Sequence, residues 1–156
     1  MALRRIPSAS SGRRLVLLDA SVLVAASHSA SGGSALAIEV CQGSKFRAAI
    51  TVRIILEARV NIAEKFGEPE LLRFYQQLAT LEPAMVAHPP LERMAECGRL
   101  VGEKDAHVLA AALECGADYL LTLDRRHLLT PSVLSAGLSV KVLMPGDFLK
   151  QIATIV

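Results

Sequence analysis

Short apolar runs alternate along this chain with longer segments of helical periodicity, and no other feature constrains its fold as strongly. We interpret these runs as strands over residues 15–18, 48–51, 85–88, 118–122 and 141–144. Strands that alternate with helices predict a parallel sheet with helices packed on both faces. In sheets of this kind, ligands bind beyond the carboxyl ends of the strands.

The segments between the runs predict helices over residues 34–42, 52–65, 68–81, 91–100 and 105–115, and from Pro145 onward. A short helical stretch is expected to open at Asp124. The helix over 105–115 is apolar nearly all round, which predicts that it is buried, and Gly116 ends it. In the helix over 68–81, the residues expected to face inward are Leu71, Leu72, Tyr75, Leu78 and Ala79.

The composition limits the classes of function. Hydrophobic residues make up 52% of the chain and aromatic residues 4%, with no Trp, so the core consists of small branched side chains that suit a buried parallel sheet. An aromatic surface on which bases stack is not expected. A net charge of +2 does not by itself indicate a nucleic-acid partner. If such a partner binds, it would have to contact a local patch of positive charge. No apolar run is long enough to cross a bilayer, and no membrane association is expected.

The chain is expected to form one domain with a short tail. Residues 1–14 contain arginines and serines but no acid, which predicts a flexible basic tail, and residues 15–156 show no linker that would divide them. Cys41, Cys97 and Cys115 lie in apolar helical contexts, which favours free thiols in a reducing compartment, the cytoplasm. The high apolar content is compatible with a homodimer.

Four acidic residues fall where this fold would bring them together. Asp19 ends the first strand, and Asp124 follows the fourth strand. The first and fourth strands are neighbours if the strand order switches between them. Asp105 begins the buried helix at the same end of the sheet, and Glu57 lies within the second helix. Carboxylates in one pocket repel each other unless a cation neutralises them. Ligands that are all oxygens favour Mg²⁺ or Mn²⁺ over Zn²⁺.

Each acid also has an ordinary structural explanation. Asp105 and Asp124 are well placed to cap helices, and Glu57 can pair with a neighbouring arginine. Asp19 is the hardest to explain in this way, because a carboxylate after a buried strand is costly unless something satisfies it. No Gly-x-Ser-x-Gly motif indicates a serine nucleophile. The histidines are too dispersed to predict a zinc site; they are His28, His88, His107 and His127.

The ordered motifs resemble those of PIN-domain nucleases. Leu15–Val24 is similar to the opening motif of that family, and Thr51–Glu57 is similar to its second motif. Asp105–Ala112 and Gly116–Asp124 resemble the third and fourth motifs. Val142–Leu149 is similar to the closing strand and helix of a subgroup that contains toxins of toxin–antitoxin pairs.

This resemblance implies a three-layer α/β/α sandwich with a central, mostly parallel sheet. It implies an endoribonuclease that uses Mg²⁺ or Mn²⁺ to hydrolyse RNA phosphodiester bonds, with an antitoxin protein as a partner. Ser21 and Thr122 match polar positions that support the family's acidic quartet. The quartet itself, which binds the metal and carries out catalysis, is matched by Asp19, Glu57, Asp105 and Asp124.

The chain departs from the family pattern after its fourth acid. Arg125 and Arg126 stand where some members carry a further acid, and Ala20 stands where Thr is frequent. We therefore expect one metal ion, held chiefly by Asp19 and Asp105. The two arginines either contact substrate phosphate or are simply solvated.

Two other classes of protein share parts of this pattern. A phospho-receiver module needs an acidic pair after the first strand and a Lys-Pro step near the last strand, whereas Ala20 and Ser21 follow Asp19 here and Lys141 is separated from Pro145. A catalytically silent PIN-like domain that only binds a partner also fits the sequence. This sequence lacks the Asp-x-Asp motif that a dehalogenase-type phosphatase needs. It also lacks the glycine-rich first turn that a dinucleotide binder needs.

Overall fold

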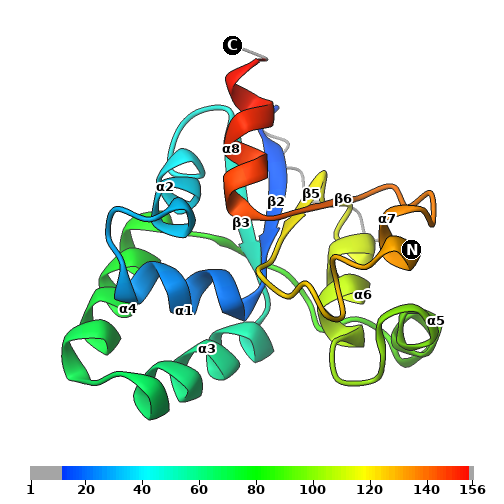
Figure 1. Cartoon of the computed structure of the whole chain (residues 1–156), viewed down its shortest axis with the longest axis horizontal. Helices are drawn as coiled ribbons and strands as arrows, with labels where there is room; N and C mark the ends of the chain where they lie inside the picture. Colours follow the sequence, from blue (N-terminus) through cyan, green and yellow to red (C-terminus); the bar gives the residue numbers. More distant parts are fainter. Residues whose placement is uncertain (1–11, 155–156) are drawn as a thin grey trace.

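The computed structural model describes residues 12–154 (Figure 1). The strands of this part of the chain are β2 (Arg14–Leu18), β3 (Phe46–Ile50), β4 (Ala84–Met85), β5 (Tyr119–Leu121) and β6 (Lys141–Leu143). They form one sheet in the order β4-β3-β2-β5-β6, and each neighbouring pair is parallel. The predicted parallel sheet is therefore confirmed.

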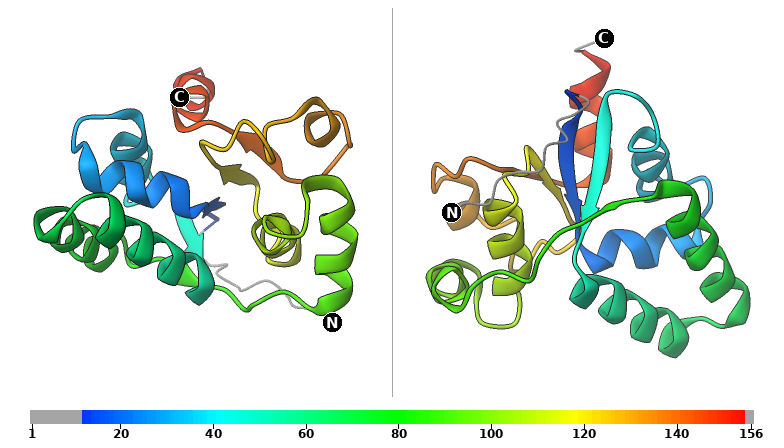
Figure 2. Two further views of the ribbon diagram at one scale, coloured as in Figure 1. Left: turned by 60° about the horizontal axis from the view of Figure 1, so that its bottom comes forward. Right: turned by 180° about the vertical axis from the view of Figure 1, so that it is seen from behind.

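Helices cover both faces of this sheet (Figure 2). One face carries α1 (Ala20–His28), α2 (Gly33–Val40), α3 (Val52–Lys65) and α4 (Glu68–Leu81). The other face carries α5 (Leu91–Val101), α6 (Ala106–Glu114) and the short α7 (Pro131–Leu134). The last helix, α8 (Pro145–Ala153), packs against α2. The three-layer α/β/α arrangement is confirmed.

The strand order places the end of β2 beside the end of β5. Leu17 and Leu18 of β2 pair with Leu120 and Leu121 of β5. The chain leaves β2 toward β3 on one side and returns as β5 on the other, so the order switches between these two strands. A crevice for ligands opens at such a switch point. The expectation that the strands before Asp19 and Asp124 are neighbours is confirmed.

Aromatic side chains pack α8 against the amino ends of the strands, opposite the crevice. The ring of Phe148 is fully buried and lies 5.3 Å from that of Phe46 and 5.1 Å from that of Tyr119, measured between ring centroids. Both contacts are edge-to-face, a favourable arrangement for aromatic pairs. Phe46 and Tyr119 are the first residues of β3 and β5, so this cluster covers the amino ends of these strands and does not lie at their carboxyl ends.

The inward face of α4 differs from the prediction. Phe74 and Leu81 are its buried residues, whereas Leu72 is 58% exposed and Tyr75 is 43% exposed. Ala79 is exposed as well. The expectation that Leu72, Tyr75 and Ala79 face inward is therefore wrong, although Leu71 and Leu78 do pack against the core. Leu71, Phe74, Leu78 and Leu81 form the stripe that meets the core, at the spacing of one helix face.

Several element boundaries also differ from the prediction. The strand predicted over 85–88 is instead the two-residue β4, and Pro83, which precedes it, cannot donate to a sheet ladder. The first turn of α2 follows Gly32 rather than Ser34. Asp124 opens a turn, and the next helix begins at Pro131.

The predicted tail lies mostly outside the described residues, which begin at residue 12. Arg14, assigned to that tail, is instead the first residue of β2, where it pairs with Phe46. Its guanidinium donates a hydrogen bond to the Tyr119 hydroxyl at 3.2 Å. Within residues 12–154, no helix is both long and apolar enough to span a membrane.

The corrected face of α4 predicts unequal costs for one substitution at two positions. Leu81→Ala removes a side chain that is 5% exposed and should lower the free energy of unfolding by about 2–5 kcal/mol. Leu72→Ala removes one that is 58% exposed and should cost under about 0.5 kcal/mol. Urea denaturation of both variants measures the difference, and equal losses would contradict the assignment.

Candidate metal centre

Asp19 lies where β2 ends and α1 begins, and only 8% of it is exposed. Its Oδ1 accepts a hydrogen bond from the backbone N–H of Ala20 at 2.9 Å and so caps α1. Its Oδ2 accepts hydrogen bonds from the hydroxyls of Ser21 and Thr122, each at 2.8 Å. Burial raises the pKa of the Asp19 carboxyl, and the hydrogen bonds that it accepts oppose this rise. The carboxylate is held in a single orientation at the switch point.

Ser21 and Thr122 connect this carboxylate to the loop after β5. The Ser21 hydroxyl accepts a hydrogen bond from the backbone N–H of Leu123, and the Thr122 hydroxyl accepts one from that of Asp124, both at 3.0 Å. Because each oxygen already accepts an N–H, its own proton is free to point at Asp19. The two hydroxyls therefore fix where Asp124 lies relative to Asp19.

Asp105 and Asp124 meet at the side chain of His127. Nδ1 of His127 lies 3.2 Å from Oδ2 of Asp124 and 3.5 Å from Oδ2 of Asp105. Oδ1 of Asp124 accepts the backbone N–H groups of Arg126 and His127, both at 3.0 Å. Asp105 occupies the cap position of α6 without a capping hydrogen bond from its side chain, so a capping role does not explain it. Burial, and then the charge of Asp124, raise the pKa of Asp105, while His127 opposes the rise.

Glu57 on α3 is held by a buried histidine on α6. Nε2 of His107 lies 3.2 Å from Oε2 of Glu57, and His107 is 1% exposed. Burial, reinforced by the charge of Arg53, lowers the pKa of His107 to about 4, so the ring is neutral at pH 7. A neutral ring that contacts a carboxylate through Nε2 carries its proton there and donates it. Burial also raises the pKa of Glu57, and Arg53 and Lys104 oppose that rise.

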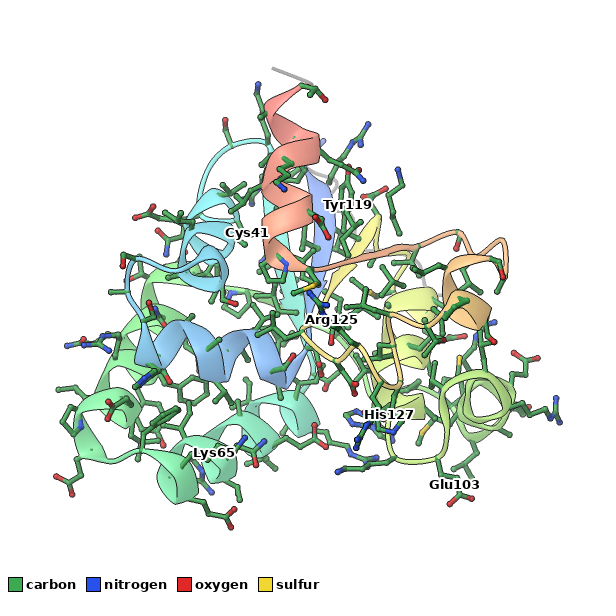
Figure 3. All side chains as sticks on the ribbon, viewed as in Figure 1. Cys41, Lys65, Glu103, Tyr119, Arg125 and His127 are labelled. Atoms are coloured by element: carbon green, nitrogen blue, oxygen red, sulfur yellow. The ribbon has the colours of Figure 1, made fainter. Side chains whose placement is uncertain are left out.

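The four acids line one groove of about 780 Å³. The groove continues away from them between α1 and α3, past Val24, Leu56 and Val60, to Lys65 and Phe66. Figure 3 shows His127 and Tyr119 at opposite ends of the sheet. Lys65 lies at the lower left of the same view. The cationic side chains that line the groove are those of Arg53, Lys65 and Lys104.

The donor set of this groove fits a divalent cation. One ligand atom each of Asp105, Asp124 and His127 lies within 4.8 Å of the others, a span that one ion can bridge. The pKa values of Asp19, Glu57 and Asp105 are all raised, chiefly by burial, which shows that the local positive charge does not fully compensate these carboxylates. A bound cation would remove that imbalance.

The structure brings together the side chains that the sequence singled out, with two exceptions. The four acids share the groove, and Ser21 and Thr122 contact Asp19 directly. Arg125 and Arg126 are exposed and do not line the groove. Sequence reasoning missed the contacts of His107 and His127. Of these, only His127 gave a usable signal, because it follows Asp124 by three residues and a turn brings such residues together.

Comparison with known proteins places this α/β domain in a family. The sequence model of the PIN domain matches residues 15–126, a stretch that contains all four acids. The chain therefore belongs to the PIN domain family, whose members are generally nucleases. No curated protein matches the sequence.

Solved structures share the fold at low sequence identity. The crystal structure of PAE2754 from Pyrobaculum aerophilum is similar with a TM-score of 0.60 and 18% identity, over 98% of this chain and 99% of that chain. The structure of VapBC2 from Rickettsia felis, bound to a DNA fragment from their promoter, is similar with a TM-score of 0.60 and 14% identity, over 82% and 96% of the two chains.

The phospho-receiver alternative does not fit this structure. The lysine considered for it, Lys141, pairs with Tyr119 at the start of β6. That position is the amino end of the sheet, whereas Asp19 follows the carboxyl end of β2. Lys141 therefore cannot contact a group carried by Asp19.

The raised pKa of Asp105 predicts a gain of stability on its neutralisation. A carboxyl whose pKa is higher in the folded state binds protons more tightly there, so stability is lost as pH rises from its unfolded pKa of about 3.9 through its folded value. Asp105→Asn should then raise the unfolding free energy at pH 7 by about 1 kcal/mol in the absence of metal. The gain should vanish near pH 4.

Thermal denaturation in EDTA between pH 4 and 8 measures this effect. Asp147→Asn is the control, because Asp147 is exposed in the first turn of α8, where a negative charge is favourable. The control should not be stabilised. A destabilised Asp105→Asn at pH 7 would contradict the charge imbalance at the groove.

Proposed function

We propose that this protein is a metal-dependent endoribonuclease that hydrolyses phosphodiester bonds of RNA. The observation that carries the proposal is the groove of a PIN domain lined by four carboxylates, those of Asp19, Glu57, Asp105 and Asp124. The ligands best suited to this set are Mg²⁺ and Mn²⁺, because both accept carboxylate oxygens. When bound, such an ion acts as a Lewis acid toward the phosphoryl group.

The acids take different roles in this proposal. Asp19 and Asp105 are the main ligands of the ion, and Asp124 is a further ligand, directly or through water. The hydroxyls of Ser21 and Thr122 keep Asp19 oriented, because both donate to its Oδ2. Asp19 is therefore already oriented before an ion binds.

Glu57 is the base of the reaction. Its raised pKa makes it a better proton acceptor than an ordinary glutamate, and the hydrogen bond from His107 holds its carboxylate toward the groove. Water loses a proton to Glu57 as it attacks phosphorus, and the bond from phosphorus to the 3′ oxygen breaks. The leaving 3′ oxygen takes up a proton from solvent water, so the products carry a 5′-phosphate and a 3′-hydroxyl.

The cations near the acids are candidates for binding the RNA backbone. Arg53, Lys65 and Lys104 line the same groove and can contact phosphates that flank the cleaved bond. Arg125 and Arg126 are exposed directly after Asp124 and are placed to meet phosphates outside the groove.

We further propose that the protein is the toxin of a toxin–antitoxin pair. VapBC2 from Rickettsia felis, which shares the fold, supports this proposal. An antitoxin protein is then a partner, the homodimer is its expected assembly, and the cytoplasm is where it acts on RNA. A catalytically silent domain that only binds a partner is the alternative that the following assay decides.

The assay is cleavage of a mixed RNA pool with Mg²⁺ or Mn²⁺, followed by mapping of the cut ends. The wild-type protein should cut, and EDTA should abolish cutting. Asp19→Asn and Glu57→Gln should lose activity, the latter by about 10²–10⁴-fold. Asp147→Asn, which alters an exposed acid on α8, should retain it. Cleavage that survives EDTA or Asp19→Asn would overturn the proposal.

The contact between His107 and Glu57 predicts different effects for two amide substitutions. His107→Gln can place an N–H near the position of Nε2 and should keep most of the activity, whereas the shorter Asn cannot reach Glu57. His107→Asn should therefore lower kcat by about 10–100-fold with little change in KM. Melting temperatures provide the control, since both variants disturb a buried site. Equal losses of kcat would argue against a positioning role.

A further inference from the structure

We infer that His127 supplies a nitrogen ligand to the metal ion, so that this centre prefers Mn²⁺ over Mg²⁺. The inference rests on the metal site of the proposed function and goes beyond the four acids. Its starting point is that Nδ1 of His127 lies 3.2 Å from Asp124 and 3.5 Å from Asp105, both measured to Oδ2. The imidazole nitrogen therefore faces the same point as two carboxylate oxygens.

The turn after Asp124 produces this convergence. Oδ1 of Asp124 accepts the backbone N–H groups of Arg126 and His127, which fixes the start of the turn. Its Oδ2 is left to face the His127 ring and Asp105. One oxygen of Asp124 thus positions the histidine while the other shares a site with it. The ligand atoms of all three side chains lie within 4.8 Å of each other.

The other explanation is that His127 is only a counter-charge for two carboxylates. Its side chain is 48% exposed, so it can turn into solvent if an ion displaces it. In that case the ion contacts oxygens alone. Both explanations account for the geometry without metal. They differ in whether the imidazole nitrogen of His127 contacts the bound ion.

A nitrogen ligand changes which ion the centre selects. Mg²⁺ prefers oxygen ligands and retains its waters, whereas transition metals accept imidazole more readily. A site with one imidazole beside carboxylates should therefore bind Mn²⁺ more tightly than Mg²⁺. Replacement of the imidazole by an oxygen donor should reduce this difference.

Pulsed electron paramagnetic resonance of the full chain loaded with Mn²⁺ tests the inference. A directly coordinated imidazole produces modulation from ¹⁴N in the echo envelope. This modulation is expected in the wild type and should be absent in His127→Asn and His127→Asp. His28→Asn is the control, because His28 stacks on Phe66 at the far end of the groove. It should retain the nitrogen modulation.

Calorimetric titration with Mn²⁺ and with Mg²⁺ gives a second readout. His127→Asn should weaken Mn²⁺ binding by at least about tenfold and Mg²⁺ binding less. His127→Asp should keep Mn²⁺ bound and lower the ratio of Mn²⁺ to Mg²⁺ affinity. This second variant separates loss of the nitrogen from loss of the site.

The outcomes distinguish this inference from the proposed function. If Mn²⁺ binds without nitrogen modulation, or if the affinity ratio is the same in all variants, the inference is wrong. The proposed function still stands in that case when RNA is cut in a metal-dependent manner. If the wild type binds no Mn²⁺ and cuts no RNA, both are wrong.

Discussion

The buried carboxylate of Asp19 fixes how the other groups of this site are arranged. It follows a strand whose last residues are fully buried, and it is itself only 8% exposed. A charge in that place is tolerated only if hydrogen bonds satisfy it. Thr122 can donate one because β5 lies directly beside β2, and Ser21 donates another from the first turn of α1. The hydrogen bonds that satisfy this charge therefore depend on the strand order.

The structural and functional explanations of these acids are compatible. Asp19 caps α1 with Oδ1 while Oδ2 takes the two hydroxyls, and Asp124 holds its turn with Oδ1 while Oδ2 faces His127. In each case one oxygen stabilises the backbone and orients the other. The Oδ2 atoms of Asp124 and Asp105 both lie near Nδ1 of His127, where burial raises the pKa of Asp105. This arrangement is costly without a cation, which is the expected condition of a site selected for binding rather than for stability.

The sequence was sufficient for the sheet and for the acids because both depend on simple rules. Alternating short apolar runs and amphipathic segments predicted the parallel sheet, and acids at the ends of two neighbouring strands predicted the crevice. The face of α4 was not predictable in the same way. Leu71 and Leu72 are adjacent, as are Phe74 and Tyr75, so two helix faces fit the pattern equally well.

The roles of the histidines depend on tertiary structure. His107 meets Glu57 only because α3 and α6 both reach the switch point, although 50 residues separate the two side chains. No spacing rule connects them. His127 reaches Asp105 only through the turn that Asp124 organises. These contacts converge on a place where we propose that the acids hold one divalent ion. Anomalous diffraction from crystals soaked in Mn²⁺ can locate such an ion. One strong peak is expected between Asp19, Asp105 and Asp124. A peak elsewhere on the chain, with none in the groove, would contradict it.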